Sequence, residues 1–200
     1  MSREDVEIKC RKILYRGFFQ LKKSSLRHKK FDGSWSETIS REVFERRAVA
    51  EIVPYNPVRD RIILIEQFRP GPMAAGAQNS WMIEVVAGIL ESKETPENLA
   101  MRKTFEETGG ELTDILPICA FYMAPGSSPE YCHLFCGRID STDIGGLHGN
   151  SDEGEDIRVF SEASGIAFAR VSRGEINSVF SIIALQWLQL NYKDIRRRWT

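Results

Sequence analysis

The sequence of 200 residues predicts an α+β fold, arranged as an α/β/α sandwich and preceded by a small β unit. Three observations lead to this prediction. Alternating apolar runs broken by turn residues fill the chain up to Phe68, and a single helix pattern follows near residue 100. A long apolar stripe at helical spacing then closes the chain, so strands and helices are expected to form separate layers.

The first 45 residues predict an N-terminal antiparallel β domain. Its three candidate strands span 6–17, 18–31 and 34–46. Asp32-Gly33 is a common hairpin signal, because glycine accepts the positive φ of a tight turn. Two further candidate strands, at 48–56 and 61–68, are separated by a turn that starts at Asn56. We therefore expect a first domain at 1–45 and a second domain at 46–200.

The rest of the chain alternates between loops, strands and helices. A loop rich in glycine, proline and alanine covers 69–80, and a buried strand is expected at 81–88. Thr95-Pro96 and Gly109-Gly110 are the start and end signals of a helix. The elements expected after it are strands at 115–124 and 131–140, a long flexible acidic loop at 145–157, and helices at 162–174 and 177–199.

Composition argues against several classes of function. The formal net charge is −1, so no bulk electrostatic attraction points to nucleic acid or to a membrane surface. The charged N-terminus lacks the apolar run of a secretory signal, and no apolar stretch approaches the length of a membrane span. The four cysteines have no zinc-site spacing and are expected to be reduced thiols. These observations predict a cytoplasmic protein.

The functional prediction depends on residues 88–110. A helix that starts at Pro96 places residues 103, 106 and 107 on one face, because positions three and four apart are neighbours on a helix. Carboxylates on such a face form an all-oxygen site suited to Mg²⁺ or Mn²⁺. A divalent ion that bridges two phosphates polarises phosphorus and activates a water molecule. For an acidic pair alone, the alternative is a solvated helix face.

The same segment resembles the Nudix box, G-x5-E-x7-R-E-U-x-E-E-x-G-U, in which U is a bulky aliphatic residue. It matches the box at Gly88, Glu94, Arg102, Glu106, Glu107 and Gly109. The box has a glutamate directly after its arginine, whereas this chain has Lys103. Thr104 and Gly110 are milder departures, because each replaces a bulky apolar residue.

Beyond the box, the chain resembles the bacterial ADP-ribose pyrophosphatases over nearly its whole length. The segments that carry this resemblance are 15–19, 56–69, 124–130, 146–159 and 181–190. The resemblance implies a Nudix α/β/α sandwich with an N-terminal β domain, in a domain-swapped homodimer. It also implies cleavage of ADP-ribose to AMP and ribose 5-phosphate with Mg²⁺ (or Mn²⁺) as cofactor. Another nucleoside diphosphate sugar, such as GDP-mannose, is an alternative substrate.

The resemblance also assigns roles to individual residues. The implied metal ligands are the backbone carbonyl of Ala87 and the carboxylates of Glu106 and Glu107. The implied catalytic residues are Glu106, Arg102 and Glu153, the last as general base or as the group that orients water. The implied substrate contacts are Phe18 on adenine from the partner subunit, Arg41 and Arg69 on the diphosphate, and Glu130 near the terminal ribose.

Lys103 is the departure with chemical consequences. The family has a metal-binding glutamate at this position, and an ammonium group here would pair with Glu106 and Glu107 and compete with Mg²⁺. Three interpretations stay open. The chain hydrolyses its substrate weakly with fewer metal ions, it binds ADP-ribose without hydrolysis, or Lys103 is an altered residue in an otherwise active protein.

Overall fold

The computed structural model describes residues 2–140, 142, 144–150, 152 and 154–200, which form two compact units. The first unit contains the chain up to residue 48 together with residues 121–132. The second contains residues 49–120 and 133–200. The segment 121–132, which follows a strand of the second unit in the sequence, was not assigned to the N-terminal domain from the sequence pattern.

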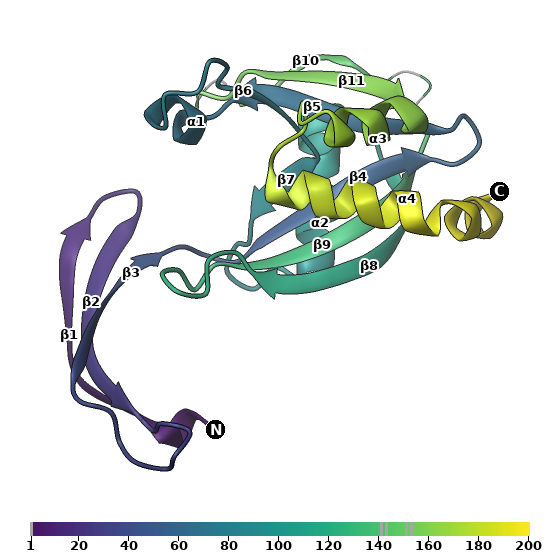
Figure 1. The fold of residues 1–200 in the computed structure, drawn as a ribbon. Helices are drawn as coiled ribbons and strands as arrows, with labels where there is room; N and C mark the ends of the chain where they lie inside the picture. The colour runs from purple at the N-terminus through teal and green to yellow at the C-terminus, as the bar shows by residue number, and fades with distance from the viewer. Residues whose placement is uncertain (1, 141, 143, 151, 153) are drawn as a thin grey trace. The chain divides into compact units, whose positions relative to one another are not determined.

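The first unit is built on a three-stranded antiparallel sheet (Figure 1). After a short 3-10 turn, η1 (Arg3–Asp5), its strands are β1 (Val6–Arg16), β2 (Gln20–His28) and β3 (Ile39–Glu45), paired in the order β1-β2-β3. The predicted turn at Asp32-Gly33 is confirmed, with Gly33 at φ +84°. No residue of these three strands is buried, so the sheet has no hydrophobic core of its own.

The second unit is organised around a sheet that has eight strands in the described part of the chain. These strands are β4 (Val49–Asn56), β5 (Arg61–Phe68), β6 (Trp81–Glu84), β7 (Val86–Ile89), β8 (Leu112–Tyr122), β9 (Tyr131–Ile139), β10 (Gly146–His148) and β11 (Ile157–Ala163). Their order is β10-β11-β5-β4-β9-β8, with β6 beside β5 and β7 beside β4. Every residue of β4 is buried, which marks this strand as the centre of the sheet.

Helix α2 (Pro96–Thr108) covers one side of this sheet, and α3 (Ser164–Ser172) and α4 (Val179–Trp199) cover the other (Figure 1). The short helix α1 (Pro70–Ala74) lies in the loop between β5 and β6 and has no buried residue. Leu99 and Ala100 of α2 are buried in one cluster with Ile52 of β4. Ala184 and Leu188 of α4 are buried as well, and α4 also contacts β4. The predicted α/β/α sandwich is therefore confirmed.

The helices in the described part of the chain are all too short or too polar to cross a membrane.

The structure corrects four local predictions. The helix expected from residue 162 begins at Ser164, because residues 157–163 form β11 and pair antiparallel with β5. The strand expected at 81–88 is interrupted at Val85, so that β6 pairs with β5 and β7 pairs with β4. The loop at 69–80 contains helix α1, and the acidic loop at 145–157 contains β10. Each difference depends on pairing or packing with a segment that local periodicity does not reveal.

Asp60 generates a prediction about the stability of the second unit. Its Oδ1 accepts hydrogen bonds from Ser164 Oγ at 2.6 Å and from the hydroxyl of the fully buried Tyr55 at 3.0 Å. We expect Asp60→Ala to lower the free energy of unfolding by about 2–4 kcal/mol, because two hydroxyl groups lose their acceptor. Val58→Ala, in the same turn but exposed, should change it by less than about 0.5 kcal/mol. Urea unfolding measures both, and equal effects would contradict this account.

Candidate active site

Helix α2 presents the motif residues because its two ends are well defined. Thr95 Oγ1 accepts a hydrogen bond from Asn98 N at 3.2 Å, and Pro96 occupies the first turn. At the other end Gly109 adopts φ +69°, a conformation that glycine accepts without strain. The thirteen-residue helix between them carries Arg102 and the glutamate pair on neighbouring turns.

Arg102 joins the loop before α2 to the exposed part of the helix. Its Nε and Nη2 donate to the two carboxylate oxygens of Glu94 at 2.9 and 3.0 Å. Its Nη1 donates to Glu106 at 3.1 Å. A forked, permanently charged donor can hold two carboxylates in fixed positions at once. The structure therefore brings Glu94, Arg102 and Glu106 of the motif together.

Glu107 is the most unusual group of the site, because the fold buries it. Only 4% of the residue is exposed, and its Oε2 has no hydrogen-bond partner among the described residues. Burial raises the pKa of this carboxyl to about 8, although Lys103, Arg69 and a backbone hydrogen bond from Ala87 act in the opposite direction. A buried oxygen without a donor is suited to a cation or a proton.

Lys103 lies against both glutamates. Its Nζ is 3.2 Å from Glu106 Oε2 and 4.0 Å from Glu107 Oε1. Burial disfavours the ammonium, but Glu107, Glu106 and Glu155 outweigh this effect and raise the pKa of Lys103. The lysine therefore stays charged at neutral pH and neutralises part of the acidic face.

The stem of Lys103 lies next to Gly88, the first residue of the motif. A Cβ added at Gly88 would lie 2.6 Å from Lys103 Cγ and 2.8 Å from Leu99 Cδ1. The absence of a side chain at this position thus lets α2 approach β7 closely. Only 18% of the Lys103 side chain is exposed to solvent, so most of its stem is covered by neighbouring residues.

Glu155 is a site residue that the sequence analysis missed. It acts electrostatically on both Lys103 and Glu107, so its carboxylate lies close to them. Glu153, which was predicted from the same acidic loop, lies outside the described residues. The Glu-Gly-Glu sequence at 153–155 offers two carboxylates, and the spacing alone does not indicate which one faces the helix.

Arg69 also belongs to this neighbourhood. Its charge lowers the pKa of Glu107, which places its guanidinium near the glutamate pair. Its Nε donates to Glu84 Oε2 at 2.7 Å. Glu84, the last residue of β6, is nine-tenths buried and was likewise not selected from the sequence.

Three other predicted site residues lie in the first unit. Phe18 is 86% exposed and contacts Phe19 edge to face at 4.7 Å. Arg41 is exposed on β3, and its Nη1 donates to the carbonyl oxygen of Ser40. Glu130 is buried and pairs with Arg46 Nε at 3.1 Å.

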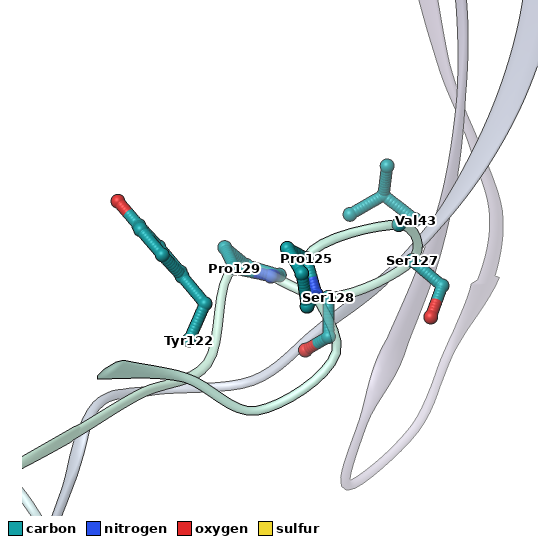
Figure 2. Close-up of a pocket in the computed structure, with 7 residues that line it drawn as sticks. Val43, Tyr122, Pro125, Ser127, Ser128 and Pro129 are labelled. Carbon is teal, nitrogen blue, oxygen red and sulfur yellow. The ribbon is translucent and has the colours of Figure 1, made fainter.

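A cavity of about 320 Å³ lies in the first unit, beside the loop that leads to Glu130. Its lining residues are Val43, Tyr122, Pro125, Gly126, Ser127, Ser128 and Pro129, most of them shown in Figure 2. The amide of Phe44 donates to the carbonyl oxygen of Ser127, which attaches the loop to β3. Two prolines restrict the backbone of this loop, and Ser127 and Ser128 line the cavity beside them.

Comparison with known proteins identifies a domain family and relatives that match nearly the whole chain. The family model of the NUDIX domain matches residues 34–176. The ADP-ribose pyrophosphatase of Escherichia coli (strain K12) is 40% identical over 198 residues, which cover 99% of this chain and 94% of the relative. The ADP-ribose pyrophosphatase of Haemophilus influenzae is 36% identical over 200 residues, covering 99% and 92%.

Two further comparisons extend this result. The GDP-mannose pyrophosphatase of Salmonella typhimurium (strain LT2) is 30% identical over 152 residues, which cover 76% of this chain and 78% of the relative. A crystal structure described as that of an ADP compounds hydrolase superposes with a TM-score of 0.73 over 98% of both chains. Its sequence identity is 19%, so this last similarity concerns the fold.

The contact between Gly88 and Lys103 gives a testable prediction. We expect Gly88→Ala to lower the free energy of unfolding by about 1–3 kcal/mol, because its Cβ would press on Lys103 and Leu99. Adding Lys103→Ala should recover part of this loss in a double-mutant cycle. Gly165→Ala, which meets no neighbour on α3, should be neutral or slightly stabilising. Thermal or urea unfolding measures the free energy of unfolding of each variant. An equal loss of stability for Gly88→Ala and Gly165→Ala would contradict the close approach of Lys103 to Gly88.

Proposed function

The chain belongs to the NUDIX domain family, and we propose that it hydrolyses the diphosphate of ADP-ribose to AMP and ribose 5-phosphate. One observation carries the proposal: α2 gathers Arg102, Glu106 and the buried Glu107 beside Ala87. Two relatives that match almost the whole chain are ADP-ribose pyrophosphatases, which supports this choice of substrate. We also propose that the protein works in the cytoplasm.

A divalent ion, Mg²⁺ or Mn²⁺, would be held by Glu106, Glu107 and the carbonyl oxygen of Ala87. The unpaired oxygen of Glu107 fits a cation, but the Lys103 ammonium already contacts both carboxylates. The donor set therefore fits one ion weakly, completed by water and substrate oxygens as Mg²⁺ commonly requires. When bound, the ion supplies polarisation of the phosphorus and neutralises charge that develops on the diphosphate.

The residues of the chain have separate tasks in this proposal. Arg102 fixes Glu106 and Glu94, so that the carboxylates keep their positions as charge develops. Arg69 binds the diphosphate with the N–H groups that it does not use on Glu84. A carboxylate of the acidic loop, Glu153 or its neighbour Glu155, accepts the proton of the attacking water.

We propose that residues of the N-terminal β unit, Phe18 and Arg41 among them, complete the site of a partner subunit in a domain-swapped homodimer, and that Glu130 lies near the terminal ribose. A sheet without a buried residue is not a stable free-standing domain, and its apolar side chains require a cover. The large exposed apolar residues on β1 are Val6, Ile8, Ile13, Leu14 and Tyr15. A second copy of the chain would bury them in an isologous interface.

Two alternative functions have specific support. The relatives at 30% identity include a GDP-mannose pyrophosphatase, so another nucleoside diphosphate sugar is the second candidate substrate. The ammonium of Lys103 among the carboxylates supports the third, a dimer that binds ADP-ribose with little hydrolysis. The three functions can be separated by measuring the phosphate-containing products released from a panel of nucleotide sugars, with and without Mg²⁺. Release from ADP-ribose supports the first function, release from another nucleotide sugar supports the second, and little release from any of them supports the third.

The assembly has its own prediction. We expect sedimentation equilibrium at micromolar concentration to give a dimer. Phe18→Ala should weaken the binding of ADP-ribose at least about tenfold while the dimer persists, because a stacked aromatic ring contributes on the order of 1–3 kcal/mol. Phe31→Ala, an exposed aromatic elsewhere in the first unit, is the matched control. A monomer in solution would remove the proposal.

A further prediction concerns Lys103 and hydrolysis. We expect Lys103→Glu to bind Mg²⁺ more tightly and to hydrolyse ADP-ribose at least roughly a hundredfold faster, because removing one electrostatic stabiliser typically costs about 10²–10³ in rate. Glu153→Gln should then slow the Lys103→Glu enzyme without changing substrate affinity. Magnesium titration and single-turnover rates test both steps. If the natural chain already turns over as fast as Lys103→Glu, position 103 is not a metal-ligand position.

A further inference from the structure

The acidic face of α2 contains a cation that belongs to the chain itself. Lys103 Nζ lies 3.2 Å from Glu106 Oε2 and 4.0 Å from Glu107 Oε1. The lysine stem lies next to Gly88, where an added Cβ would come within 2.6 Å of Lys103 Cγ. A charged group fixed between two carboxylates performs the neutralisation that a bound metal ion otherwise provides there.

The carboxylates by themselves form a poor metal site. Within the part of the chain that the structure describes, no three acidic, histidine or cysteine side chains converge closely enough to hold a metal ion. Glu107 Oε2 is buried and receives no hydrogen bond from a described residue. Lys103 is the cation that the structure places beside this carboxylate, at a position where the family box has a ligand.

We propose that Lys103 is the resident cation of a diphosphate-binding site, so that this chain binds a nucleoside diphosphate without a divalent metal ion. The class of ligand rests on the proposed function. The inference goes beyond that function because it separates two steps. Lys103 supports binding of the nucleoside diphosphate without a metal ion, whereas hydrolysis still uses a divalent ion.

The hydrogen bonds of Glu106 explain how Lys103 can turn to a ligand. Glu106 has two cationic partners, since Arg102 Nη1 lies 3.1 Å from its Oε1 and Lys103 lies 3.2 Å from its Oε2. When Lys103 donates to a phosphate oxygen instead, Arg102 still neutralises Glu106. The exchange therefore keeps a counter-charge on the exposed Glu106, and because an ammonium has three donors, one can turn to a ligand while the cation stays beside the buried Glu107.

The local charge makes binding of an anion possible. With every group ionised, one lysine and two glutamates at 103, 106 and 107 carry a net charge of −1, whereas three glutamates would carry −3. A diphosphate that approaches this chain therefore meets less negative charge than it would meet with glutamate at position 103. Arg69, which pairs with Glu84 and whose positive charge also acts on Glu107, adds a second cation for the diphosphate.

The test measures binding to the full-length protein by isothermal titration calorimetry in EDTA. The probes are ADP and the α,β-methylene analogue of ADP-ribose, which cannot be cleaved at the diphosphate. We expect the natural chain to bind at least one probe in EDTA, with less than about a threefold change in affinity when Mg²⁺ replaces EDTA. Loss of a charge-assisted hydrogen bond should make Lys103→Met and Lys103→Gln at least about tenfold weaker.

Two further variants complete the design. Lys103→Glu should lose binding in EDTA and regain it with Mg²⁺, because metal ions must then neutralise the face. Lys193→Met removes an exposed lysine charge from α4 and should bind like the natural chain. Thermal unfolding identifies any variant that does not fold, and the two neutral substitutions provide independent readings.

The outcomes separate this inference from the proposed function. The inference is overturned if the natural chain binds neither probe in EDTA, or if a folded neutral variant binds as tightly as the natural chain. If binding in EDTA depends on Lys103 but neither the natural chain nor Lys103→Glu hydrolyses ADP-ribose with Mg²⁺, the inference stands and the proposed function fails. If the chain hydrolyses ADP-ribose but binds the probes only with Mg²⁺, the proposed function stands and the inference fails.

Discussion

The site depends on the burial of one carboxylate, Glu107, on the inner face of α2. Leu99 enters the core on this face, and Lys103 and Glu107 follow it at intervals of four residues. Helix geometry therefore turns both side chains toward the sheet once Leu99 is packed. A buried carboxylate has to be paired, protonated or bound to a cation, and the choice of counter-charge determines the chemistry of the site.

The departures from the box are accommodated by local structure. Thr104 is fully buried where an apolar residue is expected, and its hydroxyl donates to the carbonyl oxygen of Ala100 at 2.8 Å. Gly110 has no room for the expected bulky residue, since an added Cβ would lie 2.5 Å from Ile144 Cδ1. Both substitutions keep the helix packed. Lys103 differs from them because it changes charge rather than shape.

Local sequence signals were sufficient for parts of the fold and insufficient for others. The cap at Thr95, the end of α2 at Gly109 and the buried strand β4 follow from short-range patterns, and the structure contains all three. Strand β11 escaped prediction because its stability comes from pairing with β5, which lies about ninety residues earlier in the chain. Glu155 escaped for a similar reason, since only the folded acidic loop brings it near Lys103. The roles of Phe18, Arg41 and Glu130 stay predictions.

The counter-charge at position 103 links folding to function. With glutamate there, two acidic side chains on successive turns would share a buried face, and their repulsion would oppose folding until a cation bound between them. Metal binding would then contribute to stability as well as to catalysis. With lysine there, the ion pair with Glu106 and the proximity to Glu107 already offset part of the negative charge of this helix face. The position at which the family motif has a glutamate thus carries a cation that belongs to the chain itself.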